Sequence, residues 1–300
     1  MTMTTGNTPE LLWPGLKKIY GDTYANWDAI YSKISNVDTT DKYFDKIQGL
    51  AGFGAAAVKD EGSSVIFDDI KQGFQKEIVQ VAYGLGAKVT MEMMRFDQYG
   101  KMNKIPAGLA RAFRHTQEIL VADQFNRGFT TATTADNVAI FSTSHLLVGG
   151  GTFRNRPTVD TDLTMGALEQ CHTDVENYND DRGLPIMATV KKLMVSSEGR
   201  LNAEKILGTE YALGTNNNDI NVVANNRRSI DLIVNPYLTD ADAWFALTSE
   251  MENGVQYLES IAPSLERDNV HNTRDLEMSH VGMLGVAAVD PRAFWGTQGA

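Results

Sequence analysis

The residues of this sequence that could take part in chemistry are five histidines, one cysteine and a few polar loops. No two histidines have the spacing of metal ligands, and no HExxH motif occurs, among His115, His145, His172, His271 and His280. Cys171 and His172 are adjacent in a predicted helix, so their side chains point about 100° apart and cannot form a nucleophile–base pair with each other. Because Cys171 lies on the apolar face of that helix, we interpret it as a buried structural thiol.

Three loops contain residue types found in active or binding sites, but each lacks a required part. The stretch STSH at 142–145 has hydroxyls beside a histidine but no G-x-S-x-G elbow. The stretch GGGT at 149–152 could surround a phosphate but lacks the Lys-Ser/Thr ending of a P-loop. The stretch NYNDD at 177–181 lacks the closing acidic ligand of an EF-hand. The sequence therefore predicts no catalytic, cofactor-binding or metal-binding residue and no cofactor, which favours a structural role.

The composition is that of a folded soluble protein, with 300 residues, 42% apolar and 22% charged. A net charge of −11 argues against a protein whose main task is to grip nucleic acid, because such proteins bind through an excess of Lys and Arg. A single cysteine excludes an intrachain disulfide and a cysteine zinc cluster. We expect no signal peptide and no membrane span, because the N-terminal stretch and the apolar runs do not have those patterns.

The element around which the chain is organised is a predicted helix from Ile105 to Phe129. Its apolar stripe recurs at spacings of three and four and comprises Leu109, Ala112, Phe113, Thr116, Ile119 and Leu120. The charged residues expected to face water or a neighbour are Arg111, Arg114, Glu118 and Arg127. Pro106 suits the start and Gly128 the end. A helix of about 22 residues would be about 33 Å long. That length favours a supporting beam, although an ordinary core helix of a globular enzyme is the alternative.

An N-terminal segment, residues 11–34, carries many large apolar side chains: Trp13, Leu16, Ile19, Tyr20, Tyr24, Trp27, Ile30, Tyr31 and Ile34. Pro14, Gly15 and Gly21 are expected to break it into short turns. Such a segment needs a surface to cover it, either its own domain or a neighbouring subunit.

A β-hairpin is predicted next, with strands at 65–70 and 76–83 and a turn at 71–75. An isolated hairpin is marginal in water, so a neighbouring subunit is a natural support. Further elements follow: a strand at 138–142, a helix at 163–179, a strand at 187–196, a helix at 198–207, a strand at 230–234, and two long strands joined by a polar turn at 267–274. This order is typical of an α+β protein with antiparallel pairing and without a βαβ rhythm.

Five stretches, taken together and in order, resemble a known family. They are LLWPGLKKIYGDTYANW at 11–27, YGLGAKVTMEMMRFDQYG at 83–100, ADQFNRGF at 122–129, AIFSTSHLLVGGGTFRN at 139–155 and VGMLGVAAVDPRAFWG at 281–296. The set is similar to the Mu-type major head subunits, a tailed-phage major capsid protein family. The resemblance spans nearly the whole chain.

This resemblance implies the α+β tailed-phage major capsid fold with four parts. They are an N-terminal arm at 1–48 that crosses to a neighbour, an extended β-hairpin loop at 49–90, a peripheral domain at 91–159 and 246–300 with a spine helix at about 105–128, and an axial domain at 160–245.

The same resemblance implies a structural major capsid protein and no enzyme. The subunit would self-assemble into hexamers and pentamers of an icosahedral head that encloses double-stranded DNA without sequence-specific contacts. Expected partners are copies of itself, a portal, and scaffolding or decoration proteins, with no membrane. The protein would reside in the virion after assembly in the host cytoplasm. The alternatives are an encapsulin-like compartment shell protein, which shares the fold, and an unrecognised soluble hydrolase.

Overall fold

A computed structural model gives the fold, and it describes residues 8–299 apart from 66, 91, 94–95, 97–99, 210–219, 222–229 and 270–274. The helices are α1 (Thr8–Ala25), α2 (Tyr31–Ile34), α4 (Lys104–Asn126), α5 (Met165–Glu176) and α6 (Arg200–Gly208), with 3₁₀ turns at Lys101–Asn103, Met251–Asn253 and Pro291–Ala293. The strands are β1 (Asn36–Thr39), β2 (Phe44–Ala51), β3 (Lys71–Val79), β4 (Val81–Val89), β5 (His145–Leu146), β6 (Thr152–Phe153), β7 (Val190–Val195), β8 (Asp231–Val234), β9 (Trp244–Thr248), β10 (Val255–Asn269), β11 (Leu276–Ala288) and β12 (Phe294–Thr297). Among the described helices, none has the length and apolar content to cross a membrane.

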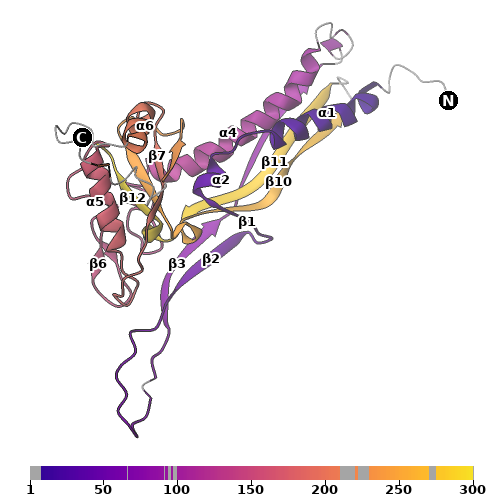
Figure 1. The fold of residues 1–300 in the computed structure, drawn as a ribbon. Helices are drawn as coiled ribbons and strands as arrows, with labels where there is room; N and C mark the ends of the chain where they lie inside the picture. The colour runs from indigo at the N-terminus through magenta and orange to yellow at the C-terminus, as the bar shows by residue number, and fades with distance from the viewer. Residues whose placement is uncertain are drawn as a thin grey trace.

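The first sheet has the strand order β1-β10-β11-β4, and α4 and α1 lie along it (Figure 1). Strands β10 and β11 are the longest and pair antiparallel, whereas β1 is parallel to β10. Phe113 of α4 lies against Gly282 of β11, where a Cβ atom would be 2.3 Å from the Phe113 ring. Glycine at this position therefore allows the long helix to approach the sheet closely.

The second sheet has the order β12-β9-β7-β8 and is packed with α5 and α6. Its core is apolar and includes the rings of Trp244 and Trp295, whose centroids are 4.9 Å apart. The α+β prediction is confirmed. The expected absence of a βαβ unit is wrong in one place, because β7 and β8 pair in parallel with α6 between them in the chain.

Most predicted elements after the long helix are present with shifted ends: α5, β7, α6, β8, β10 and β11. The predicted strand at 138–142 is wrong. Phe141 instead sits in a loop, where its ring packs between those of Phe125 and Phe294 and fills the core. The apolar run therefore reflects burial of a loop. Of the predicted turn at 267–274, residues 270–274 lie outside the described part of the chain.

The extended loop is present, but its strands are not those predicted. Strand β2 pairs antiparallel with β3, and residues 52–70 between them project far from the body (Figure 1). Residues 71–75 are therefore strand rather than turn, while the described residues 65 and 67–70 belong to the limb of the loop that leads back into β3. The β-forming residues of this stretch do not make a strand within the subunit, and the side chains of Val65, Phe67 and Ile70 are exposed.

The part of the N-terminal segment that contains Pro14, Gly15 and Gly21 forms one continuous helix, α1, and not the expected short turns, and α2 follows after a break at residues 26–30. Leu16 and Tyr20, one helical turn apart, are buried against α4 and the sheet. This tertiary burial outweighs the helix-breaking tendency of Pro14 and the glycines. In this structure the segment is covered by the body of its own subunit, which is one of the two surfaces expected from the sequence.

The long helix is confirmed as α4, but its buried stripe differs from the predicted one. Ile119 is 51% exposed, whereas Glu118 is only 2% exposed. The stripe is displaced because α4 is covered by α1 and α2 as well as by the sheet, and polar residues on that side bind the N-terminal segment. Gly128 has no positive φ angle; its Cβ would lie 2.7 Å from Phe141, so close packing explains the glycine.

Candidate functional site

The described histidines and the cysteine do not gather into one site but are distributed over several elements. His115 lies on α4, Cys171 and His172 on α5, and His280 on β11, while His271 is outside the described residues. Burial raises the pKa of the Cys171 thiol, so the unreactive protonated form is favoured. Within the described ranges, no three His, Cys, Asp or Glu side chains come together in a way that could hold a metal ion.

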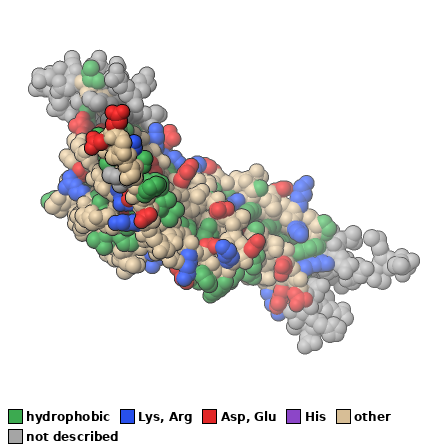
Figure 2. Space-filling view, turned by 90° about the horizontal axis from the view of Figure 1, so that it is seen from below, with side chains coloured by type: hydrophobic (Ala, Val, Ile, Leu, Met, Phe, Trp, Pro, Cys, Tyr) green, Lys and Arg blue, Asp and Glu red, His purple; other side chains and the backbone are tan. Residues whose placement is uncertain are grey.

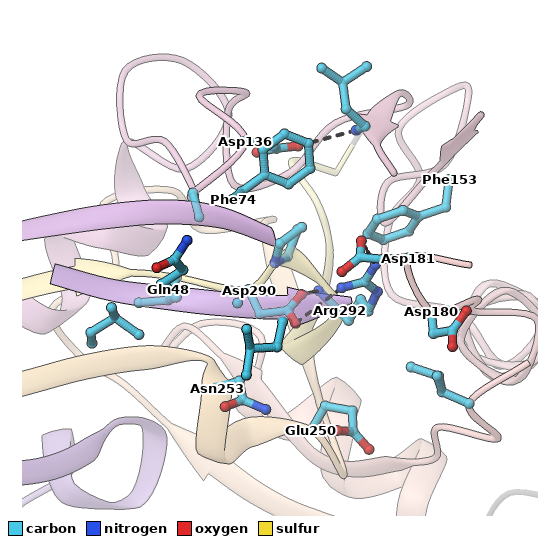
Figure 3. A pocket seen from close by; sticks show the side chains of 18 of the residues that line it. Gln48, Phe74, Asp136, Phe153, Asp180, Asp181, Glu250, Asn253, Asp290 and Arg292 are labelled. Atoms are coloured by element: carbon cyan, nitrogen blue, oxygen red, sulfur yellow. Dashed lines mark hydrogen bonds and ion pairs between the residues drawn. The ribbon is translucent and has the colours of Figure 1, made fainter. Parts of the chain in front are cut away.

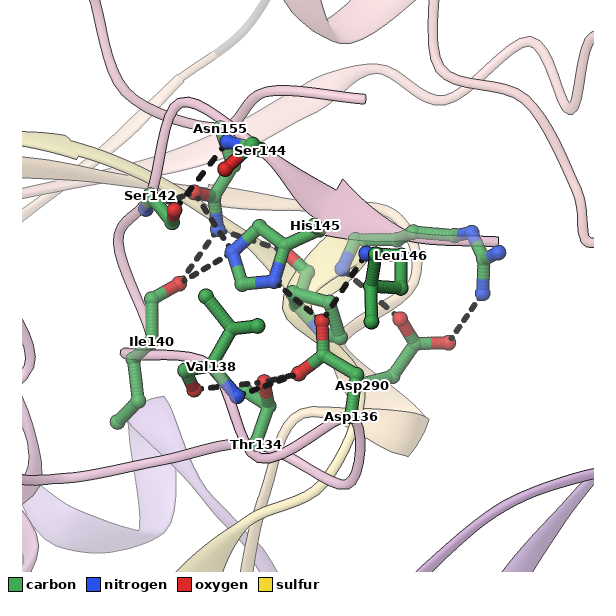
Figure 4. A network of polar contacts seen from close by, with 12 residues as sticks. Thr134, Asp136, Val138, Ile140, Ser142, Ser144, His145, Leu146, Asn155 and Asp290 are labelled. Atoms are coloured by element: carbon green, nitrogen blue, oxygen red, sulfur yellow. Dashed lines mark hydrogen bonds and ion pairs between the residues drawn. The ribbon is translucent and has the colours of Figure 1, made fainter. Parts of the chain in front are cut away.

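His145, the first residue of β5, belongs to a buried polar network that includes the loop before this strand (Figure 4). Its Nδ1 lies 2.8 Å from Asp136 Oδ2, and its Nε2 lies 3.1 Å from Asn155 Oδ1. Burial alone would raise the pKa of Asp136, but hydrogen bonds from His145 and Thr134 outweigh burial and lower it. The histidine resembles part of a hydrolase triad, but Nε2 faces amide and backbone carbonyl oxygens rather than a serine hydroxyl. The network holds the loop together.

The glycine-rich and acidic loops predicted from sequence also contact each other. The N–H of Gly149 donates to the carbonyl of Asp181 at 2.8 Å, so this amide is not free for a phosphate. Gly150 and Gly151 adopt positive φ angles of 95° and 96° in the turn between β5 and β6. Asp180 Oδ1 accepts the N–H groups of residues 182 and 184. These loops therefore support one another.

A cavity of about 370 Å³ lies beside the base of the extended loop (Figure 3). Its wall includes Arg292, which is 2.7 Å from Asp181 Oδ1 and 3.3 Å from Asp290 Oδ2. These two carboxylates outweigh burial and raise the pKa of Arg292. Arg292 therefore ties the turn after α5 to the segment before β12.

The most extensive polar contacts of α4 hold the N-terminal segment. Glu118 accepts the N–H groups of Ile30 and Tyr31, each at 2.8 Å. Arg114 donates to the carbonyl of Tyr24 near the end of α1 through Nε at 3.1 Å. The carboxylate thus lies at the start of α2 and the guanidinium at the end of α1, as the partial charges of helix ends favour. Burial raises the pKa of Glu118, and the two N–H donors oppose that rise.

The extended loop carries large apolar side chains that nothing in the subunit covers. Val58 is 93% exposed, Phe67 92% and Val65 60%. Figure 2 shows further hydrophobic side chains on the face seen from below, in patches between charged groups of both signs. Single exposed apolar residues are ordinary, but several on one projecting loop mark a contact surface for another chain.

A long helix on a sheet, a second compact sheet and a projecting apolar loop define a subunit with a structural role in a larger assembly. The sequence model of the phage capsid protein family matches residues 74–296, and the chain belongs to that family. It is therefore a phage capsid protein. No curated protein matches the chain.

Several solved structures share the fold at low sequence identity. The procapsid of bacteriophage JBD30 is 13% identical, with a TM-score of 0.57 over 98% of this chain and 76% of that one. The capsid of the cyanophage P-SCSP1u is 11% identical, with a TM-score of 0.57 over 91% and 88%. The virus-like particle from Pyrococcus furiosus is 10% identical, with a TM-score of 0.56 over 95% and 98%.

The residues that matter for this site were not singled out correctly from the sequence. Arg114 and Glu118 were expected to face water or a neighbour, but they bind the N-terminal segment of the same chain. Both residues lie next to the apolar stripe of the predicted helix, and this position was the only signal in the sequence that they could be covered. Nothing in the sequence near them identifies the partner. The sequence pattern predicts a strand at Phe67, although the two acidic residues that follow it, Asp68 and Asp69, are typical of an exposed loop.

Proposed function

We propose that this capsid protein is a Mu-type major head subunit that assembles into hexamers and pentamers around double-stranded DNA, without catalytic activity. The ordered sequence resemblance supports the Mu-type assignment. The acidic net charge of −11 supports a wall that encloses DNA without binding it tightly. Ring-closing contacts between different surfaces of identical subunits would produce the capsomers.

The observation that carries this proposal is the exposed apolar side chains of the extended loop. Val58, Val65 and Phe67 extend from a two-stranded base into solvent, where they gain nothing from burial. Burying one such side chain on another copy would contribute about 1.5–3 kcal/mol. Repeated at every subunit contact, this burial would stabilise a closed shell far more than any single pair.

The four parts implied by the resemblance form the proposed division of labour. They are the arm at 1–48, the extended loop at 49–90, the peripheral domain at 91–159 and 246–300, and the axial domain at 160–245. Helix α4, close to the expected spine at 105–128, would support the peripheral domain. Strands β9 and β12 pair with the sheet of the axial part, so the two domains share strands across that boundary.

Other components of the particle would be separate chains. A portal would occupy one vertex, and scaffolding or decoration proteins would act from outside this polypeptide. Assembly would take place in the host cytoplasm, without a membrane, and the finished subunit would reside in the virion.

An encapsulin-like compartment is the second candidate, and the fold likeness to the virus-like particle from Pyrococcus furiosus favours keeping it. The two roles differ in what the shell contains. Genes for a portal, a large terminase and tail proteins beside this one would support the phage head; a neighbouring cargo enzyme would support the compartment.

The test is an added charge on the loop. Phe67→Asp should leave the unassembled subunit folded, because the side chain is exposed, but should prevent shells from forming. Ser64→Asp is the matched control, since it places the same charge at an exposed position of the same loop. Negative-stain electron microscopy counts the particles. Normal shells from Phe67→Asp would contradict the proposal.

A further inference from the structure

One arginine ties the extended loop to the body at the base of the loop. We call this base, residues 52–54 and 68–69, the neck. Arg182, in the turn after α5, donates from Nε to the carbonyl of Gly52 at 3.0 Å. Its terminal NH2 group donates to Asp68 Oδ1 at 3.0 Å and to the carbonyl of Asp69 at 2.7 Å. One guanidinium therefore contacts both limbs of the loop, just after β2 and just before β3.

Asp68 completes the link between the two limbs. Its second oxygen, Oδ2, accepts the N–H of Gly54 at 2.9 Å. The hydrogen bond from Gly54 and the contact with Arg182 lower the pKa of Asp68, so it is charged at neutral pH. The planar fork of an arginine suits this arrangement, because its donors point in fixed directions to several oxygens at once.

The body side of this contact is held by a local hydrogen bond and by close packing. The backbone N–H of Arg182 donates to Asp180 Oδ1 at 2.8 Å, and Gly183 follows with a φ angle of 81°. A Cβ atom on Gly149 would lie 2.5 Å from the carbonyl oxygen of Asp181, so the β5–β6 turn packs tightly behind. The Arg182 side chain is only 16% exposed. A fixed platform therefore presents the guanidinium to the neck.

The loop amplifies any change at its neck. From residue 52 to residue 61 the chain can extend about 30 Å. A rotation of about 10° at the neck would then move the tip by about 5 Å. A tip displaced by that distance could not form a well-packed interface, because apolar groups lose their contact energy when they are separated by about 1 Å more.

We propose that Arg182 is a positioning residue for assembly, which sets the direction in which the extended loop leaves the body and so where its tip meets the next copy. The inference rests on the proposed function of the loop. Arg182 contacts the neck and not the tip, so it acts through the loop.

The first test measures the loop in the unassembled subunit. Spin labels are placed at Ser64→Cys and Glu169→Cys, both exposed positions, while the native Cys171 is buried and unlabelled. Arg182→Ala should at least double the width of the distance distribution, and Arg182→Lys should give an intermediate width. Arg200→Ala is the control, since Arg200 pairs with Glu204 within α6. An unchanged width in Arg182→Ala would overturn the proposal.

The second test measures assembly of the same variants without labels. Arg182→Ala should reduce the yield of regular shells about tenfold, with an unchanged unfolding midpoint of the subunit. Regular shells at normal yield would overturn the positioning role. If Phe67→Asp also assembles normally, the proposed function of the loop fails first; if only Arg182→Ala does, the loop's function stands and this inference alone is wrong.

Discussion

The Glu118 carboxylate is buried in the subunit, where backbone N–H groups hydrogen-bond to it. Its two oxygens accept one N–H each, from Ile30 and Tyr31, at the start of α2. These are among the N–H groups that a helix start leaves without partners. The residue therefore joins the N-terminal segment to α4 by satisfying backbone groups that would otherwise be buried alone.

Glu118→Ala should lower the free energy of unfolding of the unassembled subunit by about 2–4 kcal/mol, because it leaves two buried donors unsatisfied. Glu118→Gln should cost less, since the amide oxygen still accepts one N–H. Glu204→Ala, which removes an exposed carboxylate from α6, should change stability by less than about 1 kcal/mol. Urea unfolding of the three variants measures these changes in free energy. Equal effects of Glu118→Ala and Glu204→Ala would show that the buried contact does not stabilise the subunit.

His280 makes stability depend on pH. Burial lowers the pKa of His280, whose ring packs against those of Tyr20 on α1 and Phe113 on α4. The unfolded chain therefore binds this proton at a higher pH than the folded chain does. As the pH falls below about 6.5, the ordinary value for histidine, this residue destabilises the folded state.

We expect the unfolding midpoint of the wild-type subunit to fall more between pH 7.5 and pH 5.5 than that of His280→Phe. The comparison between the two proteins is needed because burial raises the pKa of Glu118 and Glu259, and this raises the stability of the folded state as the pH falls, opposite to the effect of His280. Differential scanning calorimetry at both pH values gives the midpoints. Identical pH dependence in the two proteins would remove His280 as a cause.

At the scale of elements, α1 is the part whose role the structure changes most. It lies on α4 and on the sheet of its own subunit through Leu16 and Tyr20. Because it covers part of the hydrophobic core, it is required for the body as well as for any contact with a neighbour. The buried areas of these two side chains correspond to about 1.5–3 kcal/mol each.

Deleting residues 1–34 should abolish assembly while leaving part of the helical signal, because α4 and the two sheets lose a covering layer but keep most of their contacts. Circular dichroism reports the helices and electron microscopy the shells. Lys17→Ala, an exposed change on α1, should assemble normally. Ordinary shells from the deleted chain would show that α1 is dispensable.

The elements that could be predicted from the sequence are those whose burial repeats with a regular period. Helix α4 was placed within a few residues because apolar side chains recur along it, and α5, α6 and β7 follow the same logic. The buried stripe of α4 was displaced because the polar residues Gln117 and Glu118 also face inward. Their backbone and tyrosine partners come from distant parts of the chain, and periodicity carries no information about them.

The assignments that failed share a physical cause. Both 65–70 and 138–142 are rich in apolar residues, yet their described residues do not form strands. The first run is exposed in the subunit, and the second is buried as a loop between aromatic rings. Hydrophobicity reports that a side chain will be covered, but it does not report whether a sheet, a loop packing or a second copy covers it.

At the scale of the whole molecule, the extended loop projects away from the body of the subunit (Figure 1). The core is closed: one cluster joins α4 and the first sheet to the second sheet, another packs α5 and α6 on the second sheet, and a third packs α1 on α4 and the first sheet. Residues 52–70 add exposed apolar surface to a molecule that is otherwise complete. Membership of the phage capsid protein family supplies the setting in which that surface is used.

The central claim is tested most directly by cryo-electron microscopy of the purified full-length chain over a range of concentrations and salt conditions. We expect closed shells or capsomers in which the loop at residues 52–70 of one subunit lies on the surface of the next, with Phe67 covered at the contact. A chain that stays monomeric under all these conditions, or shells in which Phe67 remains in solvent, would contradict the account.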